Sequence, residues 1–485
     1  MSKVDVDGVI VSTEHYINGR RVSSSQTFED RSPLDWDWKL ADVCRGGELE
    51  AGLAVSAAVD AFDVWSQMSY KDRGRILRDL ADLIDANVEP IAHVECLDMA
   101  MLEESLRLRV IGRGARNFRA YADLAQEYQP RRWESNGTLN SVLRMPAGPT
   151  VVITPWNAPF MLSTWKCAPA LAAGNTVILK PAEWSPLSCS LLMDLVDDAG
   201  FPPGVFNLVQ GLGEEAGAAL VADPRVRRIS FTGSPETGRL IGESAARNLV
   251  PFTAELGGKG PFIVMDDADV DAAAEKAAVM FDDAGQVCLA GTRLLVANSI
   301  KDRFLERFTF YSERHVLGDS RKSGTTISPL IHPEHLARVE GFVERAVASG
   351  DHVVFGGHRE SDGLWFEPTL IEPHSNDAEI VQREVFGPVL TLQGFDTDAD
   401  AVALANSTRY GLSAVLYTSS ETRAAKMGKA LRAGTIWVNC FLVRDLTAPF
   451  GGTGISGIGR EGGDYALDFY SDLKTLQVKE GSVHG

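Results

Sequence analysis

The chain has 485 residues, of which 45% are hydrophobic and 23% are charged, as in a globular protein of two or three domains. Its formal net charge of -19 argues against a nucleic-acid partner, because such proteins normally carry a basic surface. No apolar run reaches the length of a membrane span and the first residues lack the pattern of a signal peptide, so we expect a cytoplasmic protein with no membrane partner.

The cysteines and histidines give no sign of a metal site or a disulfide framework. The six cysteines are widely spaced and include no CxxC pair, which argues against a zinc cage. The only close histidine pair is HPEH (332–335), which lacks the HExxH spacing that places two ligands on one helix face. We therefore expect no bound metal and reduced thiols.

The first part of the chain is predicted to be mostly helical. Apolar residues recur at three- and four-residue spacing over 51–68 and 73–94, which predicts two amphipathic helices. The segment 116–145 is predicted to be the end of a helix followed by a strand or ribbon.

From residue 149 the pattern changes to an alternation of short apolar runs with helices. Buried strands are predicted over 149–155, 176–181, 205–211, 228–233 and 251–258, and helices over 159–174, 185–200, 214–223 and 234–246. Five such alternations predict a parallel sheet with helices on both faces.

A second alternating region begins after residue 260 and predicts a second α/β domain. Its strands are predicted over 261–265, 292–298, 351–357, 389–395, 413–418 and 435–439. The last segment, 465–479, ends in a strand-like run that has no obvious partner in either domain.

Polar residues follow the predicted strands of the first sheet, where open parallel sheets bind ligands. Asn157 is a neutral donor suited to an oxyanion, but a turn residue is the more common reading. Lys180 and Glu183 suit the hydroxyls of a ribose, but taken alone a surface ion pair is preferred. Glu255 suits a general base or a paired buried carboxylate, and FTGSPETG (231–238) suits a phosphate or simply a capped helix.

Cys288 stands in FDDAGQVCLAG (281–291), behind a Gly-Gln pair and ahead of small residues. A free cysteine is most often a small buried hydrophobic residue, so this residue alone favours core packing over catalysis.

Seven motifs together resemble those of the aldehyde dehydrogenase superfamily, in order and in spacing. They are TPWNAPF (154–160), GNTVILKPAEWSP (174–186), FTGSPETG (231–238), ELGGK (255–259), GQVC (285–288), EVFGPVL (384–390) and PFGGTGISGIGRE (449–461). The resemblance covers nearly the whole chain and reverses the reading of Cys288, which now matches the catalytic nucleophile.

The resemblance implies five catalytic residues. Cys288 matches the nucleophile, Glu255 the general base and Asn157 the oxyanion donor, assisted by the backbone N–H of Cys288. Lys166 and Glu461 match residues often assigned to a proton path.

The resemblance also implies NAD as the cofactor. Lys180 and Glu183 match contacts to the adenosine ribose, and Glu183 would repel the 2′-phosphate of NADP. Gly233 and Ser234 match the pyrophosphate turn, and Glu384 matches the carboxylate on the nicotinamide ribose. The full set of expected cofactor contacts is Thr154, Pro155, Trp156, Lys180, Glu183, Gly213, Gly217, Phe231, Gly233, Ser234, Leu256, Glu384 and Phe386.

The implied fold is α/β, with two parallel-sheet domains and a small oligomerisation ribbon. We expect a cofactor domain over 1–123 and 146–255, a catalytic domain over 256–447, and oligomerisation segments over 124–145 and 466–485. A tail strand that fits a neighbour's sheet predicts a homodimer or homotetramer.

The stretch NCFLVRDLTAPFGG (439–452) resembles the branch that contains 2-hydroxymuconic and 5-carboxymethyl-2-hydroxymuconic semialdehyde dehydrogenases. This implies an aldehyde substrate from aromatic catabolism, either a semialdehyde or an aromatic aldehyde. That branch commonly has two arginines here, and this chain keeps Arg444 but has Thr447 at the second position, which predicts at most one bound carboxylate. Arg107 and Arg109 are candidate substitutes, although a solvated helix face is slightly favoured for them.

Two alternatives stay open at this point. A coenzyme A-acylating aldehyde dehydrogenase would lack the ELGGK-type base, so Glu255 argues against it. A binding protein that kept the fold and lost catalysis is disfavoured by the presence of Cys288, Glu255 and Asn157 together.

Overall fold

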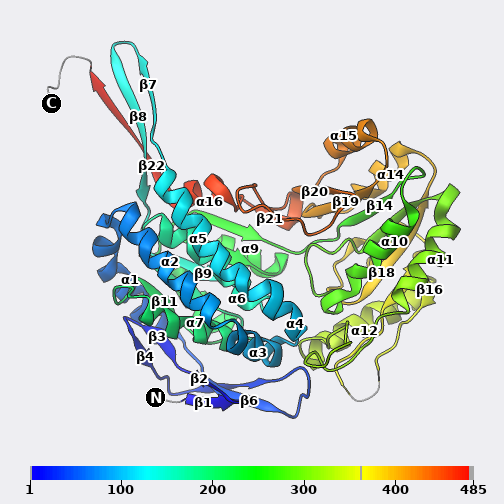
Figure 1. The fold of residues 1–485 in the computed structure, drawn as a ribbon, viewed down its shortest axis with the longest axis horizontal. Coiled ribbons are helices and arrows are strands. Elements are labelled where there is room, and N and C mark those ends of the chain that lie inside the picture. The colour runs from blue at the N-terminus through cyan, green and yellow to red at the C-terminus, as the bar shows by residue number, and fades with distance from the viewer. Residues whose placement is uncertain (1–2, 361–362, 480–485) are drawn as a thin grey trace.

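The computed structural model describes residues 3–360 and 363–479. They form two α/β lobes side by side and a ribbon that projects from the first lobe (Figure 1). The last residues of the expected oligomerisation segment, 480–485, lie outside the described part of the chain. Among the described residues, no helix is both long and apolar enough to cross a membrane.

The first lobe is built on an eight-stranded sheet whose central strands are parallel. The strand order is β21-β13-β12-β9-β10-β11-β3-β4. The bounds are β3 His15–Ile17, β4 Arg20–Val22, β9 Thr150–Ile153, β10 Val177–Lys180, β11 Phe206–Leu208, β12 Arg228–Thr232, β13 Phe252–Glu255 and β21 Gly457–Ile458. Only the pairs at the two ends of the sheet are antiparallel. The parallel sheet predicted from continuous apolar runs is thus confirmed, because strands covered on both faces need apolar residues on both.

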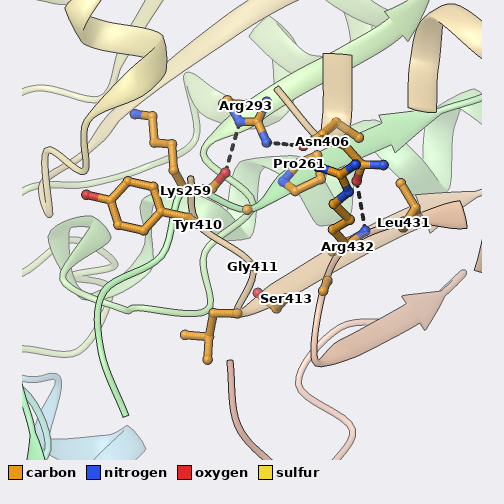
Figure 2. A pocket seen from close by; sticks show the side chains of 14 residues that line it. Lys259, Pro261, Arg293, Asn406, Tyr410, Gly411, Ser413, Leu431 and Arg432 are labelled. Carbon is orange, nitrogen blue, oxygen red and sulfur yellow. Dashed lines mark hydrogen bonds between the residues drawn. The ribbon is translucent and has the colours of Figure 1, made fainter. Parts of the chain in front are cut away.

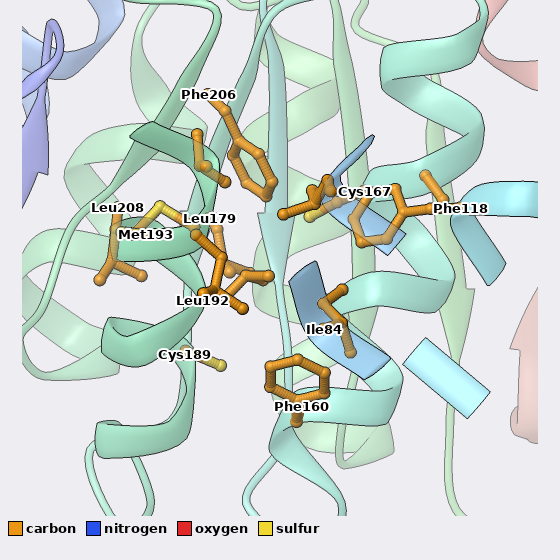
Figure 3. Close-up of a cluster of buried hydrophobic side chains, with 14 of the residues drawn as sticks. Ile84, Phe118, Phe160, Cys167, Leu179, Cys189, Leu192, Met193, Phe206 and Leu208 are labelled. Atoms are coloured by element: carbon orange, nitrogen blue, oxygen red, sulfur yellow. The ribbon is translucent and has the colours of Figure 1, made fainter. Parts of the chain in front are cut away.

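Helices cover both faces of this sheet (Figure 1). Their bounds are α1 Glu48–Gln67, α2 Tyr70–Ala86, α3 Val88–Met99, α4 Glu103–Ser105, α5 Ile111–Glu127, α6 Pro159–Ala172, α7 Leu187–Asp198, α8 Ala218–Ala222, α9 Pro235–Arg247 and α16 Gly463–Phe469. Figure 3 shows the core between them, where Phe118 of α5, Cys167 of α6 and Phe206 of β11 are at most 1% exposed. Cys167 and Cys189 are free thiols packed as core residues here.

One predicted helix is two helices in the structure. The pattern over 73–94 predicted continuity, but the chain breaks at Asn87 between α2 and α3. The Asn87 amide donates to the Leu83 carbonyl at 2.8 Å. Asparagine favours such local bonds over the regular helix ladder, so it ends one helix and begins the next.

The second lobe contains a seven-stranded sheet of order β16-β17-β18-β15-β14-β19-β20, parallel except for β16. The strands are β14 Pro261–Val264, β15 Arg293–Ala297, β16 His352–Phe355, β17 Thr369–Glu372, β18 Val389–Phe395, β19 Ser413–Tyr417 and β20 Thr435–Val438. The helices are α10 Val270–Ala278, α11 Lys301–Ser312, α12 Pro333–Ala348, α13 Glu379–Gln382, α14 Asp398–Ala405 and α15 Glu421–Ala430. All six predicted strands are present, and β17 is an addition that the sequence pattern did not reveal.

The projecting ribbon is a three-stranded antiparallel sheet of β7 (Arg131–Ser135), β8 (Thr138–Pro146) and β22 (Ser471–Lys479). The tail strand β22 pairs with β8 of its own chain along its whole length. The strand-like run that had no obvious partner in either domain thus belongs to the ribbon. The ribbon is largely exposed (Figure 1), and within the described residues the outer edges of β7 and β22 have no strand partner.

Candidate active site

The sequence-predicted site residues of the first lobe lie along one edge of its sheet. In the strand registers, Ile153 at the end of β9 stands beside Lys180 on one side and Phe231 on the other. Thr232 stands beside Glu255 at the end of β13. Because the carboxyl ends of parallel strands share an edge, polar residues from distant parts of the sequence meet there.

Cys288 lies on a tight turn that leads into β15 of the second lobe. Asp283, Ala284 and Gly285 all have left-handed backbones, with φ of 51°, 53° and 67°. A Cβ on Gly285 would lie 2.2 Å from the Gly387 carbonyl oxygen, so only glycine fits where these two segments cross. Two consecutive non-glycine residues in this region are strained, and such strain is typical of functional turns.

Gln286 holds this turn against the segment 329–331. Its side-chain oxygen accepts from the Ile331 N–H at 3.0 Å, and its amide donates to the Pro329 carbonyl at 3.4 Å. Gln286 is 1% exposed, so these bonds are shielded from water. The Gln of GQVC therefore fixes the thiol's position.

The ELGGK linker between the lobes runs directly beside Cys288. A Cβ on Gly258 would lie 2.3 Å from the Cys288 carbonyl oxygen, so the close approach requires glycine. Gly258 also donates its N–H to Glu384 at 2.7 Å. Cys288, Glu255 and Glu384, from three different segments, are thus brought together.

Burial together with the charges of Glu384 and Glu255 raises the pKa of the Cys288 thiol to about 12. Arg444 acts in the opposite direction. The thiolate is the nucleophilic form of a cysteine, so a base must remove the Cys288 proton during reaction at neutral pH.

Asn157 reaches the same turn from the end of β9. Its side-chain amide donates to the Gln286 carbonyl at 2.7 Å. An amide nitrogen carries two hydrogens, so a second N–H is available for an oxyanion that forms at the thiol.

Glu255 is 5% exposed, and neither of its carboxylate oxygens has a hydrogen-bond partner in the described structure. Burial and the negative charge of Glu461 raise its pKa well above the ordinary value. A buried carboxylate without partners is costly to maintain, which is typical of a group kept for proton chemistry.

Lys166 of α6 and Glu461 form a buried ion pair behind Glu255. The Trp165 indole N–H donates to the other Glu461 oxygen at 2.6 Å, and Lys166 donates to Ser230 at 3.1 Å. The pair is fully hydrogen-bonded, as a buried ion pair must be to be tolerated.

The adenosine half of a dinucleotide would meet the end of β10. Lys180 is 1% exposed and donates to Glu183 at 3.5 Å, and Glu183 keeps a quarter of its side chain accessible. Gly213 and Gly217 begin the next helical segment, and a Cβ on Gly217 would lie 3.4 Å from Lys180. The glycines leave open space beside the two charged groups.

The pyrophosphate would meet the start of α9. Ser234 caps this helix by accepting from the Thr237 N–H at 3.1 Å. A Cβ on Gly233 would lie 2.4 Å from the Phe231 ring, so a larger residue would displace this ring. Leu256, 8% exposed, packs against Gly238 of α9. Free N–H groups at such a helix start suit a phosphate.

The nicotinamide half would lie between Glu384 and the end of β9. Phe386 adopts a left-handed backbone with φ of 61° and contacts Trp156 edge to face at 5.4 Å. Thr154, next to Pro155, bonds Ser163 at 2.9 Å and is buried. The sheet edge thus offers space lined by glycines, a free helix start and a carboxylate at each expected ribose position. The chemistry and the order of these features fit a dinucleotide.

Arg444 lies between two aromatic rings near the site. Its guanidinium stacks over Phe450 at 3.8 Å and over Trp165 at 5.3 Å. Burial lowers its pKa, while the negative charges of Cys288 and Glu255 raise it. Arg444 is therefore a partly buried cation within electrostatic reach of Cys288 and Glu255.

Arg113 of α5 is a second cation at this place, which the sequence analysis missed. Its guanidinium lies 5.7 Å from the Trp165 ring centre that Arg444 also covers. Burial and the like charge of Arg444 lower its pKa to about 10. Two partly buried like charges at one ring favour binding of an anion near both of them.

Arg107 and Arg109 do not join this pair. Arg107 is exposed and lies 3.7 Å from Glu89, and Arg109 is exposed and bonds Ser105 at 2.8 Å. Thr447 is exposed and bonds Asp445 at 2.8 Å. Arg113, and not Arg107 or Arg109, shares the Trp165 ring with Arg444.

A cavity of about 10 Å³ lies beside the ELGGK linker, between Lys259, Arg293, Tyr410 and Arg432 (Figure 2). The Arg293 guanidinium donates to the Lys259, Leu404 and Ala405 carbonyls at 2.7–2.9 Å. The cavity has room for about one water molecule. It belongs to the support of the linker and not to a substrate site.

Comparison with known proteins gives one consistent result. The profile described as "Aldehyde dehydrogenase family" matches residues 21–476. A 2-hydroxymuconic semialdehyde dehydrogenase from Pseudomonas sp. (strain CF600) is 40% identical over 482 residues, covering 96% of this chain and 99% of that protein.

Solved structures agree with this result. The crystal structure of a putative aldehyde dehydrogenase from Burkholderia cenocepacia matches with a TM-score of 0.95 and 39% identity, covering 98% of this chain and 99% of that one. A betaine aldehyde dehydrogenase from Staphylococcus aureus, solved in complex with NAD+, matches with a TM-score of 0.94 and 35% identity over 98% and 96% of the two chains. The chain therefore belongs to the aldehyde dehydrogenase family.

Proposed function

We propose that the protein oxidises an aldehyde to the carboxylic acid with NAD as the hydride acceptor. The observation that carries this is the convergence of Cys288, Asn157 and Glu255 at the end of a row of groups suited to a dinucleotide. NAD is supported by the fit of that row and by the relative solved in complex with NAD+.

In the proposed reaction, the Cys288 thiolate bonds to the aldehyde carbon. Asn157 and the Cys288 backbone N–H then donate hydrogen bonds to the resulting oxyanion. Bound NAD supplies the chemistry of hydride acceptance. The thioester left on Cys288 is hydrolysed by water from which Glu255 takes a proton, so two easier steps replace one difficult step.

The proposed substrate is a semialdehyde or aromatic aldehyde that carries a carboxylate. Arg444 and Arg113 provide two partly buried guanidinium groups at the Trp165 ring, and a planar guanidinium binds a carboxylate through paired hydrogen bonds. The similarity to a 2-hydroxymuconic semialdehyde dehydrogenase points to the same class.

NAD is proposed to be preferred over NADP. Glu183 is a partly accessible carboxylate beside the expected ribose position, and a 2′-phosphate brought there would meet a like charge. Lys180 alone does not offset this charge, because it is already bonded to Glu183.

We further propose that the ribbon mediates a homodimer or homotetramer and that the protein acts in the cytoplasm. The unpaired outer edges of β7 and β22 offer backbone groups for another chain, as exposed edges do. The six cysteines are free, which suits a reducing compartment.

The experiment that tests this function is NADH formation, followed at the absorbance of the reduced cofactor, with a panel of semialdehydes and neutral aldehydes. Acid and NADH in equal amounts without coenzyme A support the proposal. Turnover only when coenzyme A is added would support the acylating alternative, and no NADH with any aldehyde would support the binding-protein alternative.

A further inference from the structure

Three backbone carbonyls in a row are held by side chains of α12. The Arg338 guanidinium donates to the Val385 carbonyl, and to the Glu384 carbonyl at 2.8 Å. The His335 Nε2 donates to the Phe386 carbonyl at 2.7 Å, since a carbonyl oxygen can only accept. In the described structure this stretch belongs to no helix or strand, so its carbonyls need partners of this kind.

One face of α12 is built against the segment 384–387. Arg338 and Val339 follow His335 by three and four positions, which places all three on one face of the helix. A Cβ on Gly387 would lie 2.6 Å from the Val339 side chain, so a larger residue would displace this contact. The helix thus sets both the course and the orientation of the segment.

The same segment carries the groups expected at the nicotinamide half of the cofactor. Glu384 accepts from the Gly258 N–H at 2.7 Å, which fixes its carboxylate beside the linker. The Trp156 ring centre lies 5.4 Å from that of Phe386 and 5.6 Å from that of His335. Phe386 has a left-handed backbone with φ of 61°, a conformation that persists only where neighbouring contacts enforce it. The His335 bond and the ring contacts supply that enforcement.

We propose that Arg338 and His335 are positioning residues, which hold the segment 384–387 so that its carboxylate and its aromatic ring meet the nicotinamide half of NAD. This inference rests on the proposed function and adds two residues from outside the seven motifs. Both act through the backbone of the segment. A Cβ on Gly285 would lie 2.2 Å from the Gly387 carbonyl oxygen, so the segment crosses the turn that carries the thiol. A shift of the segment therefore changes the distance between the nicotinamide and the thiol.

The primary test compares Arg338→Met, which removes both donors, with Arg338→Lys, which restores one charged donor. Lysine carries a single charged nitrogen and cannot bond both carbonyls as the guanidinium fork does. Arg345→Met is the matched control, because Arg345 is an exposed arginine of the same helix that bonds the Glu379 carboxylate at 2.7 Å. Both guanidinium groups also lie over the Phe342 ring, at 5.1 and 4.8 Å. Arg338 is exposed too, so these changes leave the packed core intact.

Cofactor binding is measured without substrate, by titrating the protein's tryptophan fluorescence with NAD and with AMP. AMP contains only the adenosine half, which is expected at Lys180 and Glu183 and not at the segment. In Arg338→Met we expect the Kd for NAD to rise by about tenfold and the Kd for AMP to stay unchanged. Arg338→Lys should give an intermediate Kd for NAD, and Arg345→Met should bind both nucleotides as wild type does.

Two rates separate a positioning role from a general loss of structure. The NADH burst in rapid mixing needs an oriented nicotinamide and should slow by about tenfold in Arg338→Met, at an unchanged half-saturating concentration of aldehyde. The hydrolysis of p-nitrophenyl acetate at Cys288 needs no cofactor and should keep its wild-type rate. His335→Leu and His335→Gln form a second pair. Glutamine keeps an N–H donor for the Phe386 carbonyl, so only the leucine variant should show the slow burst.

A wild-type burst and wild-type NAD binding in Arg338→Met would overturn the proposal. An equal loss of ester hydrolysis would also overturn it, because it would show that Arg338 only maintains the fold. A failure of the proposed function is distinguishable, because wild type would then give no burst with any aldehyde. Binding alone then decides: a rise in the Kd for NAD but not for AMP supports the positioning role, and equal changes or none overturn it.

Discussion

Arg113→Met is the change that most directly tests how the substrate carboxylate is bound. Methionine keeps much of the side-chain volume against Trp165 and removes the charge. Losing a charged hydrogen-bond donor typically costs about 1.5–3 kcal/mol. This predicts a fall of about 10- to 150-fold in kcat/KM for a carboxylated semialdehyde.

The kcat/KM for a neutral aldehyde of similar size should change little, because this substrate has no carboxylate for the guanidinium to bind. Arg116→Met is the matched control, since Arg116 is an exposed arginine on the same helix, α5. If both arginines bind one carboxylate, the Arg113→Met/Arg444→Met double variant should show a smaller change in free energy, taken from kcat/KM, than the sum of the two single changes.

The assay is the initial rate of NADH formation over a range of concentrations of each aldehyde. An equal loss for the charged and neutral substrates would show that Arg113 acts through the fold and not through the carboxylate. An unchanged kcat/KM for the charged substrate would refute the assignment of Arg113 to the substrate site.

Three further predictions concern the catalytic base, the choice of cofactor and a buried carboxylate of α3. Glu255→Gln should preserve the NADH burst and slow the steady state, and loss of the burst would point to activation of the Cys288 thiol instead. Glu183→Gln should raise kcat/KM for NADP relative to NAD, and an unchanged ratio would remove the repulsion argument. Burial raises the pKa of Glu95 from its ordinary 4.5 to about 8, so the folded state keeps a proton that the unfolded chain releases. The free energy of unfolding should therefore fall as the pH rises from about 5 to about 8. In Glu95→Gln, the urea midpoint of unfolding should depend less on pH over this range. An equal pH dependence of the midpoint in both proteins would contradict this.

The two sheets were predictable because their strands are covered on both faces. Such strands must be apolar throughout, and each such run is short and bounded by turn residues. The strand β17 (Thr369–Glu372) was not recognised, because its apolar run is only Leu370 and Ile371. The break at Asn87 was missed for a similar reason, since the apolar spacing continues across it.

The candidate site was predictable where a motif carries its own chemistry. Cys288, Glu255 and Asn157 each stand in a recognisable stretch that ends at the same sheet edge. Arg113 has no such signal, because it shares three-residue spacing along α5 with Arg116 and Arg119.

Which of these arginines lies beside Arg444 is decided by packing against Trp165, which is distant in the sequence. The exposure of Arg107 and Arg109 is likewise a property of the folded helix.

The most direct test of the account is one rapid-mixing trace of wild type and Cys288→Ala with a carboxylated semialdehyde and NAD. We predict an NADH burst and steady turnover for wild type, and neither for Cys288→Ala, while NAD binding measured by protein fluorescence is retained. NADH production at the wild-type rate in Cys288→Ala would contradict the assignment of the nucleophile and, with it, the reaction proposed for this protein.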